Sequence, residues 1–126
     1  MDQQLANAAS ESLLAHKERI VVGVTDTMYA EMPELHTRYG AIGRAKCLQD
    51  IRHNVEHLAP AVALGEPALF AKYVTWLRDM LGARNIPASD VLRSLEVMRS
   101  TVHDVLPADE AEAAARVIDA GIEVLG

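Results

Sequence analysis

The sequence contains a single cysteine, Cys47, so a disulfide within the chain is excluded. A reducing cytoplasm is the expected setting for such a chain. The first residues lack the basic and apolar regions of a secretory signal peptide. No apolar run approaches the roughly 18 residues that a membrane span requires. We therefore expect a soluble, cytoplasmic protein that does not bind a membrane.

Basic and aromatic residues are also scarce. The chain has 12 lysines and arginines against 18 acidic residues, a formal net charge of −6, and only 4% aromatic residues. It shows no basic run and no aromatic stacking platform, which argues against nucleic-acid binding. It also offers no glycine-rich phosphate loop, no Ser/His/Asp order and no defensible pair of catalytic carboxylates. We therefore expect a protein that is not an enzyme.

Helix-forming residues, by contrast, are abundant. Half of the 126 residues are hydrophobic, and Ala, Leu, Val, Glu and Arg dominate. The length suits one domain over residues 1–126, and no segment alternates with period two for long enough to be a strand. The helices are separated by predicted breaks at Pro33, residues 38–40, Gly65, residues 82–87 and Pro107. Residues 88–90 are predicted to cap the helix that follows them. The patterns predict a compact, all-α bundle of five or six helices near residues 2–12 (short or frayed), 12–31, 42–64, 67–81, 91–102 and 110–125.

The helix predicted over residues 42–64 has two adjoining faces. At 100° per residue, one apolar stripe should face the core: Leu48, Ile51, Val55, Leu58 and Val62. The stripe beside it is mostly polar: Gly43, Cys47, Asp50, Asn54 and His57. Cys47 and Asp50 are three residues apart, so the thiol and the carboxylate share one face about one turn apart. Such a stripe is where a ligand in a cleft would lie, although most amphipathic helices also have half-exposed boundary residues.

Metal and haem binding are weaker interpretations. His53 and His57 have the i, i+4 spacing used for zinc, and Cys47 and Asp50 are further possible ligands. However, the His-Glu-x-x-His order is missing. A globin-type haem would need a proximal histidine in the third helix, and residues 66–86 contain none. We therefore expect neither a metal site nor a haem site.

A series of short segments matches the pattern of a known family. The segments are Glu18-Arg19-Ile20-Val21, Pro33-Glu34, Tyr39-Gly40, the run from Gly43 to Ile51, Gly65-Glu66, Arg78-Asp79-Met80, Pro87 and Met98-Arg99. Together they resemble the phycobiliprotein subunits, which are globin-fold proteins that carry linear tetrapyrroles called bilins. From Cys47 through Arg99 the landmarks follow without a gap.

The resemblance implies roles for individual residues. Cys47 matches the cysteine that forms a thioether to ring A of the bilin, and Asp50 matches the aspartate that accepts hydrogen bonds from the central pyrrole nitrogens. Lys46 matches a basic residue that can meet a propionate. Gly43 would let a bulky ligand approach the helix, and further candidate binding residues are Arg44, Asn54 and His57.

The sequence also departs from the family at this segment. Gln49 replaces an arginine that is expected to pair with a propionate, and Glu56 replaces another arginine. His53 and Asn54 stand in place of an aromatic pair.

The resemblance implies a function and a set of partners. The residues before Lys17 are too few for the N-terminal helical hairpin of phycobiliprotein subunits, so the chain looks more like their stand-alone bacterial relatives. We expect non-enzymatic binding of a bilin (biliverdin or phycocyanobilin), with Cys47 available for attachment, in a carrier, reservoir or light-sensor role. The bilin would lie between the helices predicted at 42–64 and 67–81. The alternative is a ligand-free sensory or dimerisation module. We also expect a homodimer, formed by apolar residues left over from the core: Phe70, Tyr73 and Leu81.

Overall fold

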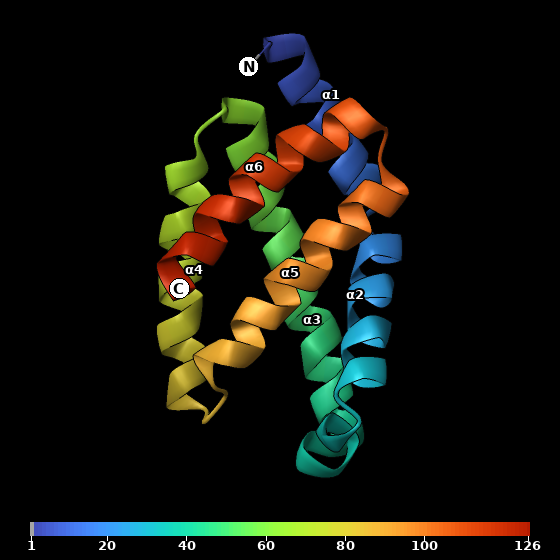
Figure 1. The fold of residues 1–126 in the computed structure, drawn as a ribbon, viewed down its shortest axis with the longest axis vertical. Coiled ribbons are helices and arrows are strands. Elements are labelled where there is room, and N and C mark those ends of the chain that lie inside the picture. Colours follow the sequence, from blue (N-terminus) through green and yellow to red (C-terminus); the bar gives the residue numbers. More distant parts are fainter. Residues whose placement is uncertain (1) are drawn as a thin grey trace.

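Six helical elements make up the part of the chain that can be described. The computed structural model describes residues 2–126, apart from the side chains of residues 38 and 39. Within these residues there is no strand, and the elements follow one another from the N-terminus to the C-terminus (Figure 1). They are α1 (Gln3–Ala15), α2 (Lys17–Glu31), α3 (Glu34–Leu64), α4 (Pro67–Ala83), α5 (Ala88–Val105) and α6 (Ala108–Leu125). The predicted all-α class is confirmed.

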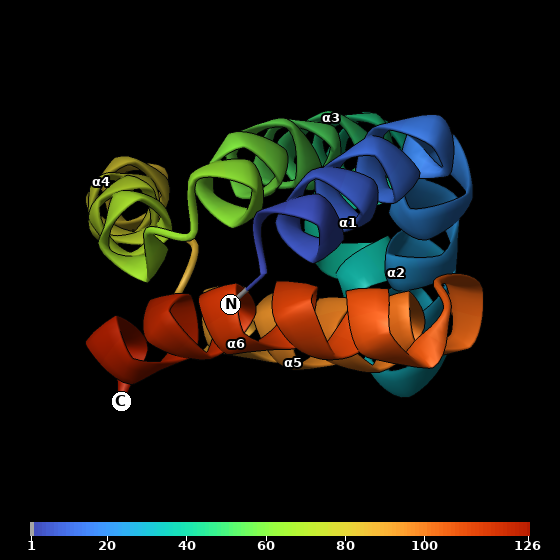
Figure 2. The same ribbon diagram turned by 90° about the horizontal axis from the view of Figure 1, so that it is seen from above.

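The helices are arranged in two layers. Figure 2 shows α5 and α6 in one layer, lying across a second layer formed by α1, α3 and α4. Between the layers, α6 packs on α4 and α1, while α2 packs on both α3 and α5 at one end of the molecule. The crossing of the layers leaves α3 in the middle, in contact with the helices before and after it.

Glycine and proline set several helix ends where the sequence predicts them. Gly65 ends α3 in the left-handed conformation, with φ 64° and ψ 32°, and its amide donates to the carbonyls of Ala61 and Val62. Glycine adopts this conformation without a steric penalty. Pro67 then opens α4 at its first position, where the missing amide hydrogen costs nothing.

Other boundaries differ from the prediction. The break between the first two helices lies at His16 rather than near residue 12, because Leu13 continues α1 into the core and is fully buried. α4 runs through Gly82 to Ala83, so the turn is shorter than predicted. Pro87 stands at the N-cap position of α5, so residues 88–90 belong to the helix rather than capping it.

α3 is longer than the predicted 42–64 helix and contains the predicted break. Gly40 has φ 65° and ψ −162°, which is not helical, so α3 consists of two helical pieces joined at this residue. The longer piece carries the predicted apolar stripe: Ile51, Val55, Leu58 and Val62 are buried, and Leu48 packs against the core. The core face of this helix is therefore as predicted.

The apolar residues that were expected to remain for a dimer interface are in the core. Phe70, Tyr73 and Leu81 have exposed fractions of 0%, 9% and 6%, respectively. Phe70 is covered because α6 packs directly on α4, Tyr73 contacts Asn54 and His57 of α3, and Leu81 lines a cavity beside α3. The pattern of α4 alone reveals none of these contacts. Their assignment to an interface between subunits is wrong.

Within residues 2–126, no helix is both long enough and apolar enough to cross a membrane.

Candidate functional site

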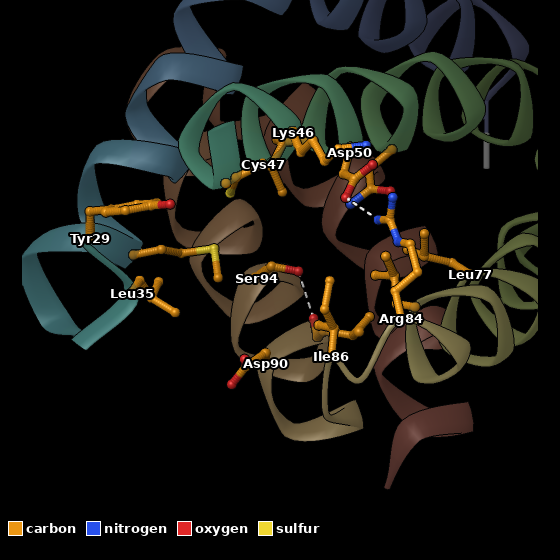
Figure 3. Close-up of a pocket in the computed structure, with 16 residues that line it drawn as sticks. Tyr29, Leu35, Lys46, Cys47, Asp50, Leu77, Arg84, Ile86, Asp90 and Ser94 are labelled. Atoms are coloured by element: carbon orange, nitrogen blue, oxygen red, sulfur yellow. Dashed lines mark hydrogen bonds and ion pairs between the residues drawn. The ribbon is translucent and has the colours of Figure 1, made fainter. Parts of the chain in front are cut away.

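A cavity of about 250 Å³ opens beside the middle of α3. α2, α3, α4, α5 and the turn between α4 and α5 all contribute to its walls (Figure 3). Most of the wall is apolar, and the following residues form it: Met28, Leu35, Ile51, Leu77, Leu81, Ile86 and Val91. The charged residues at the cavity are Lys46, Asp50, Arg84 and Asp90. A mostly apolar hollow with a few polar groups is typical of a small-molecule site.

Five of the seven predicted binding residues line this cavity: Gly43, Lys46, Cys47, Asp50 and Asn54. All five come from α3, and four of them are spaced by three or four residues, so they follow one face of the helix. Figure 3 shows Lys46, Cys47 and Asp50 along the α3 edge of the cavity. The residues from α2, the turn and α5 lie across from them.

The other two predicted residues, Arg44 and His57, are not among the described residues that line the cavity. Arg44 lies about 100° round the helix from Gly43, so its guanidinium faces α2, pairs with Asp26 and sits over the Tyr29 ring. His57 lies beyond the end of the cavity. Its ring stacks on the ring of Tyr73 with centroids 4.0 Å apart.

Tyr73 explains why the residues of the polar stripe beyond Asn54 do not line the cavity. Asn54 is 2% exposed, and its side-chain oxygen accepts a hydrogen bond of 2.6 Å from the Tyr73 hydroxyl. The same tyrosine ring stacks on His57, which stays exposed to solvent. The stripe is therefore divided between the cavity and a buried contact with α4.

Asp50 forms an ion pair at the cavity with Arg84, which follows the last residue of α4. The distance from Arg84 Nη2 to Asp50 Oδ2 is 3.2 Å. Burial raises the pKa of the Asp50 carboxyl, and the opposing effect of the Arg84 guanidinium is smaller. The carboxylate thus has less stabilisation than it would have in water, and further N–H donors or a positive charge would favour it.

Cys47 is a half-buried thiol. Its sulfur lies 4.0 Å from the hydroxyl oxygen of Thr25. Burial raises the pKa of the Cys47 thiol, the contact with Thr25 lowers it, and the negative charge of Asp50 raises it. The protonated thiol therefore predominates at neutral pH, and the nucleophilic thiolate is a minor species.

Sequence reasoning missed the residues that the other helices bring to the cavity. Examples are Met28 and Tyr29 from α2, Arg84 and Ile86 from the turn, and Ser94 from α5. Spacing along one helix carries no information on which residues of distant segments face it. No local signal in the sequence marks Arg84, because an arginine in a turn is ordinary.

The described residues do not provide a metal site. They contain no group of three or more His, Cys, Asp and Glu side chains placed to hold a metal ion. The cavity lining that the structure describes includes no histidine. The site thus offers sulfur, carboxylate and cationic groups around an apolar space.

The fold is an all-α bundle with a mostly apolar cavity against its central helix, α3. The sequence profile of the phycobilisome protein family matches residues 2–125, so the chain belongs to that family. The predicted resemblance and globin-like fold are confirmed by this match.

One curated relative is the allophycocyanin subunit beta-18 of Aglaothamnion neglectum. It is 25% identical over 99 residues, which cover 75% of this chain and 58% of that subunit. The chain thus spans little more than half the length of this relative.

Proposed function

We propose that the chain binds a linear tetrapyrrole, a bilin, in the cavity beside Cys47 and Asp50, without catalysing a reaction. The observation that carries the proposal is the placement of a thiol and a carboxylate on one edge of an apolar cavity, in a chain of the phycobilisome protein family. The bound bilin would serve as a cargo, a reserve or a light-absorbing group.

The volume of the cavity indicates that a bound tetrapyrrole would be only partly enclosed. Pockets for drug-sized ligands occupy about 300–1,000 Å³, whereas this cavity measures about 250 Å³. A tetrapyrrole would therefore lie only partly inside. Its apolar rings would contact Leu77, Ile86 and Val91, and its polar substituents would remain at the mouth.

Asp50 is the proposed partner of the pyrrole nitrogens. Its carboxylate is desolvated and only partly compensated by Arg84. A protonated tetrapyrrole offers both N–H donors and positive charge, so it would stabilise the carboxylate through charge-assisted hydrogen bonds. Binding there would in turn favour the protonated, long-wavelength form of the bilin.

Cys47 is the proposed attachment point. Its thiol would add across the carbon–carbon double bond on ring A, so that sulfur bonds to one carbon and the proton goes to the other. The raised pKa of Cys47 keeps the thiolate scarce, so we expect unassisted attachment to be slow near neutral pH.

The test is an absorption spectrum of the purified chain with biliverdin and with phycocyanobilin. We expect a strengthened long-wavelength band, which Asp50→Asn weakens or shifts to the blue. Asp79→Asn is a matched control, because Asp79 is exposed and pairs with the neighbouring Arg78. If a large excess of both bilins leaves the protein colourless, the proposal fails and the ligand-free interaction module becomes the better interpretation.

Cys47→Ala separates attachment from binding. It should abolish the covalent adduct, seen as zinc-induced fluorescence on a denaturing gel, while non-covalent binding remains. If bilins bind but neither Cys47→Ala nor Asp50→Asn alters the adduct or the spectrum, the ligand lies elsewhere on the protein.

We also propose that the chain forms a homodimer, through a face of α4 other than the one predicted. Leu69 and Trp76 are 43% and 57% exposed, and they are seven residues apart on α4. Residues at this spacing share one helix face, so the two side chains form one apolar strip that a second copy could cover.

A further inference from the structure

Arg84 holds Asp50 with a weaker contact than the bidentate arginine–carboxylate pairs of this protein. Arg52 and Glu18 pair through two hydrogen bonds of 2.9 and 2.7 Å, and Arg99 and Asp119 through two of 2.7 and 3.2 Å. In the described structure, Arg84 and Asp50 share one hydrogen bond of 3.2 Å. Bidentate pairs are the stronger arrangement, so the Arg84–Asp50 pair is the easier one to exchange.

The position of Arg84 gives it freedom to change partners. It follows the end of α4 in the turn, next to Asn85, and its side chain is 38% exposed, against 23% for Asp50. Figure 3 shows its side chain reaching from the turn to the α3 edge of the cavity, with the guanidinium at Asp50. The carboxylate is fixed on a helix, whereas the guanidinium ends a long, flexible chain.

A cationic, N–H-rich ligand would compete with Arg84 for Asp50. Both offer positive charge and N–H donors to the same carboxylate, and the ligand would do so from inside the apolar cavity. The displaced guanidinium would be left at the mouth without its carboxylate. A ligand that also carries a carboxylate could replace the lost partner, and a guanidinium can bind it with two parallel hydrogen bonds.

We propose that Arg84 selects ligands that carry a carboxylate, by exchanging Asp50 for the carboxylate of the ligand when the cavity fills. The proposal rests on the proposed function, and it assigns specificity to a residue in the turn rather than to the α3 segment. Arg84 restrains Asp50 in the empty cavity and becomes an anion contact in the filled one. Lys46 also lines the cavity, but an ammonium is a point charge without the planar fork of a guanidinium.

The test compares biliverdin, which has two propionates, with its dimethyl ester, which has none. For each ligand, Kd is measured by absorbance titration with the wild-type chain, Arg84→Gln and Arg84→Lys. Arg116→Gln is the control, because Arg116 is exposed on α6 and is not one of the described cavity residues. Thermal unfolding of each variant checks that the fold is retained.

We expect Arg84→Gln to weaken the binding of biliverdin by about two- to fivefold, the range for a partly exposed ion pair. The same change should leave the affinity for the dimethyl ester unchanged or raise it, because Arg84 no longer competes with the ligand for Asp50. Arg84→Lys should recover part of the biliverdin affinity, and Arg116→Gln should match the wild type.

The possible failures are distinguishable. If Arg84→Gln weakens the binding of both ligands equally, or of neither ligand, the proposed exchange at Arg84 is overturned, while the proposal of bilin binding stands. If the wild-type chain binds neither biliverdin nor its ester, both proposals are overturned.

Discussion

The Asp50 carboxylate acts on the Cys47 thiol, which lies one turn away on α3. The negative charge of Asp50 raises the pKa of the thiol, after the larger effect of burial. Both groups line the same apolar cavity, where water screens their charges less than at the surface. A change at Asp50 should therefore be measurable at Cys47, even without a ligand.

This coupling predicts the reactivity of Cys47. Because the thiolate is the nucleophile, the rate of alkylation by iodoacetamide should rise about tenfold per pH unit below the thiol pKa. Asp50→Asn removes the negative charge and should increase the rate at neutral pH by about two- to fivefold. The rate can be followed by mass spectrometry, with Asp79→Asn as control. An unchanged rate in Asp50→Asn would show that the carboxylate does not act on the thiol.

Asp50 also predicts a pH dependence of stability. Burial raises the pKa of its carboxyl above the ordinary value of 3.8, so ionising this group costs more in the folded chain than in the unfolded chain. This cost to stability is absent at pH values below 3.8, grows as the pH rises through the raised pKa of Asp50, and is complete at neutral pH. Asp50→Asn should therefore stabilise the ligand-free chain at neutral pH, by about 1 kcal/mol or less for a partly exposed group.

The measurement is chemical unfolding of the wild type and Asp50→Asn at several pH values. The gain in the free energy of unfolding from Asp50→Asn should shrink as the pH falls toward 3.8. Asp79→Asn, at an exposed carboxylate, should lie within about 0.5 kcal/mol of the wild type throughout. A destabilised Asp50→Asn at neutral pH would mean that the contact with Arg84 outweighs the cost of burial.

At the level of elements, α4 and α6 approach most closely at Gly121. A Cβ atom at this position would lie 2.9 Å from Phe70 Cε2 and 2.9 Å from Val74 Cγ2. Phe70 and Val74 are both fully buried, so neither side chain has free space to move into. Glycine is therefore required at this position by the close packing of the two helices. Its backbone conformation is not the reason, because its φ is not in the left-handed region.

Gly121→Ala should destabilise the chain. Overpacking in a core costs about 1–3 kcal/mol, and the higher helix propensity of alanine returns up to about 1 kcal/mol. The expected net loss is about 1 kcal/mol, which lowers Tm by about 2–5 °C. Gly82→Ala is the control, because a Cβ there meets no atom within 4 Å, and it should be neutral or stabilising. Equal or higher stability of Gly121→Ala would show that α4 and α6 can separate at little cost.

At the level of the whole molecule, the sequence predicted the helices better than the contacts between them. The apolar stripe of α3 and the helix end at Gly65 are local features, set by spacing and backbone conformation, and both are confirmed. The burial of Phe70 depends on α6, which is about 50 residues away along the chain. Likewise, Arg84 meets Asp50 only because the turn folds back onto α3. Neither contact has a signal in the spacing of its own segment.

The exposed strip on α4 predicts the state of association. A stable interface buries about 800 Å² on each partner, and a two-fold dimer would place the Leu69–Trp76 strips of two copies against each other. Light scattering over a series of concentrations should then give about twice the 13.7 kDa of one chain. Trp76→Arg should shift the mass toward the monomer, because it puts like charges at the centre of the proposed interface.

Ile42→Arg provides the matched control for this change. Ile42 is 75% exposed and lies on α3, just after the break at Gly40, rather than on the α4 strip. The substitution adds the same charge at another exposed apolar position, so the dimer mass should be retained. A wild-type mass near 13.7 kDa at every concentration would remove the dimer proposal. Dissociation by Ile42→Arg but not by Trp76→Arg would move the interface from α4 to the tip of the molecule formed around Gly40.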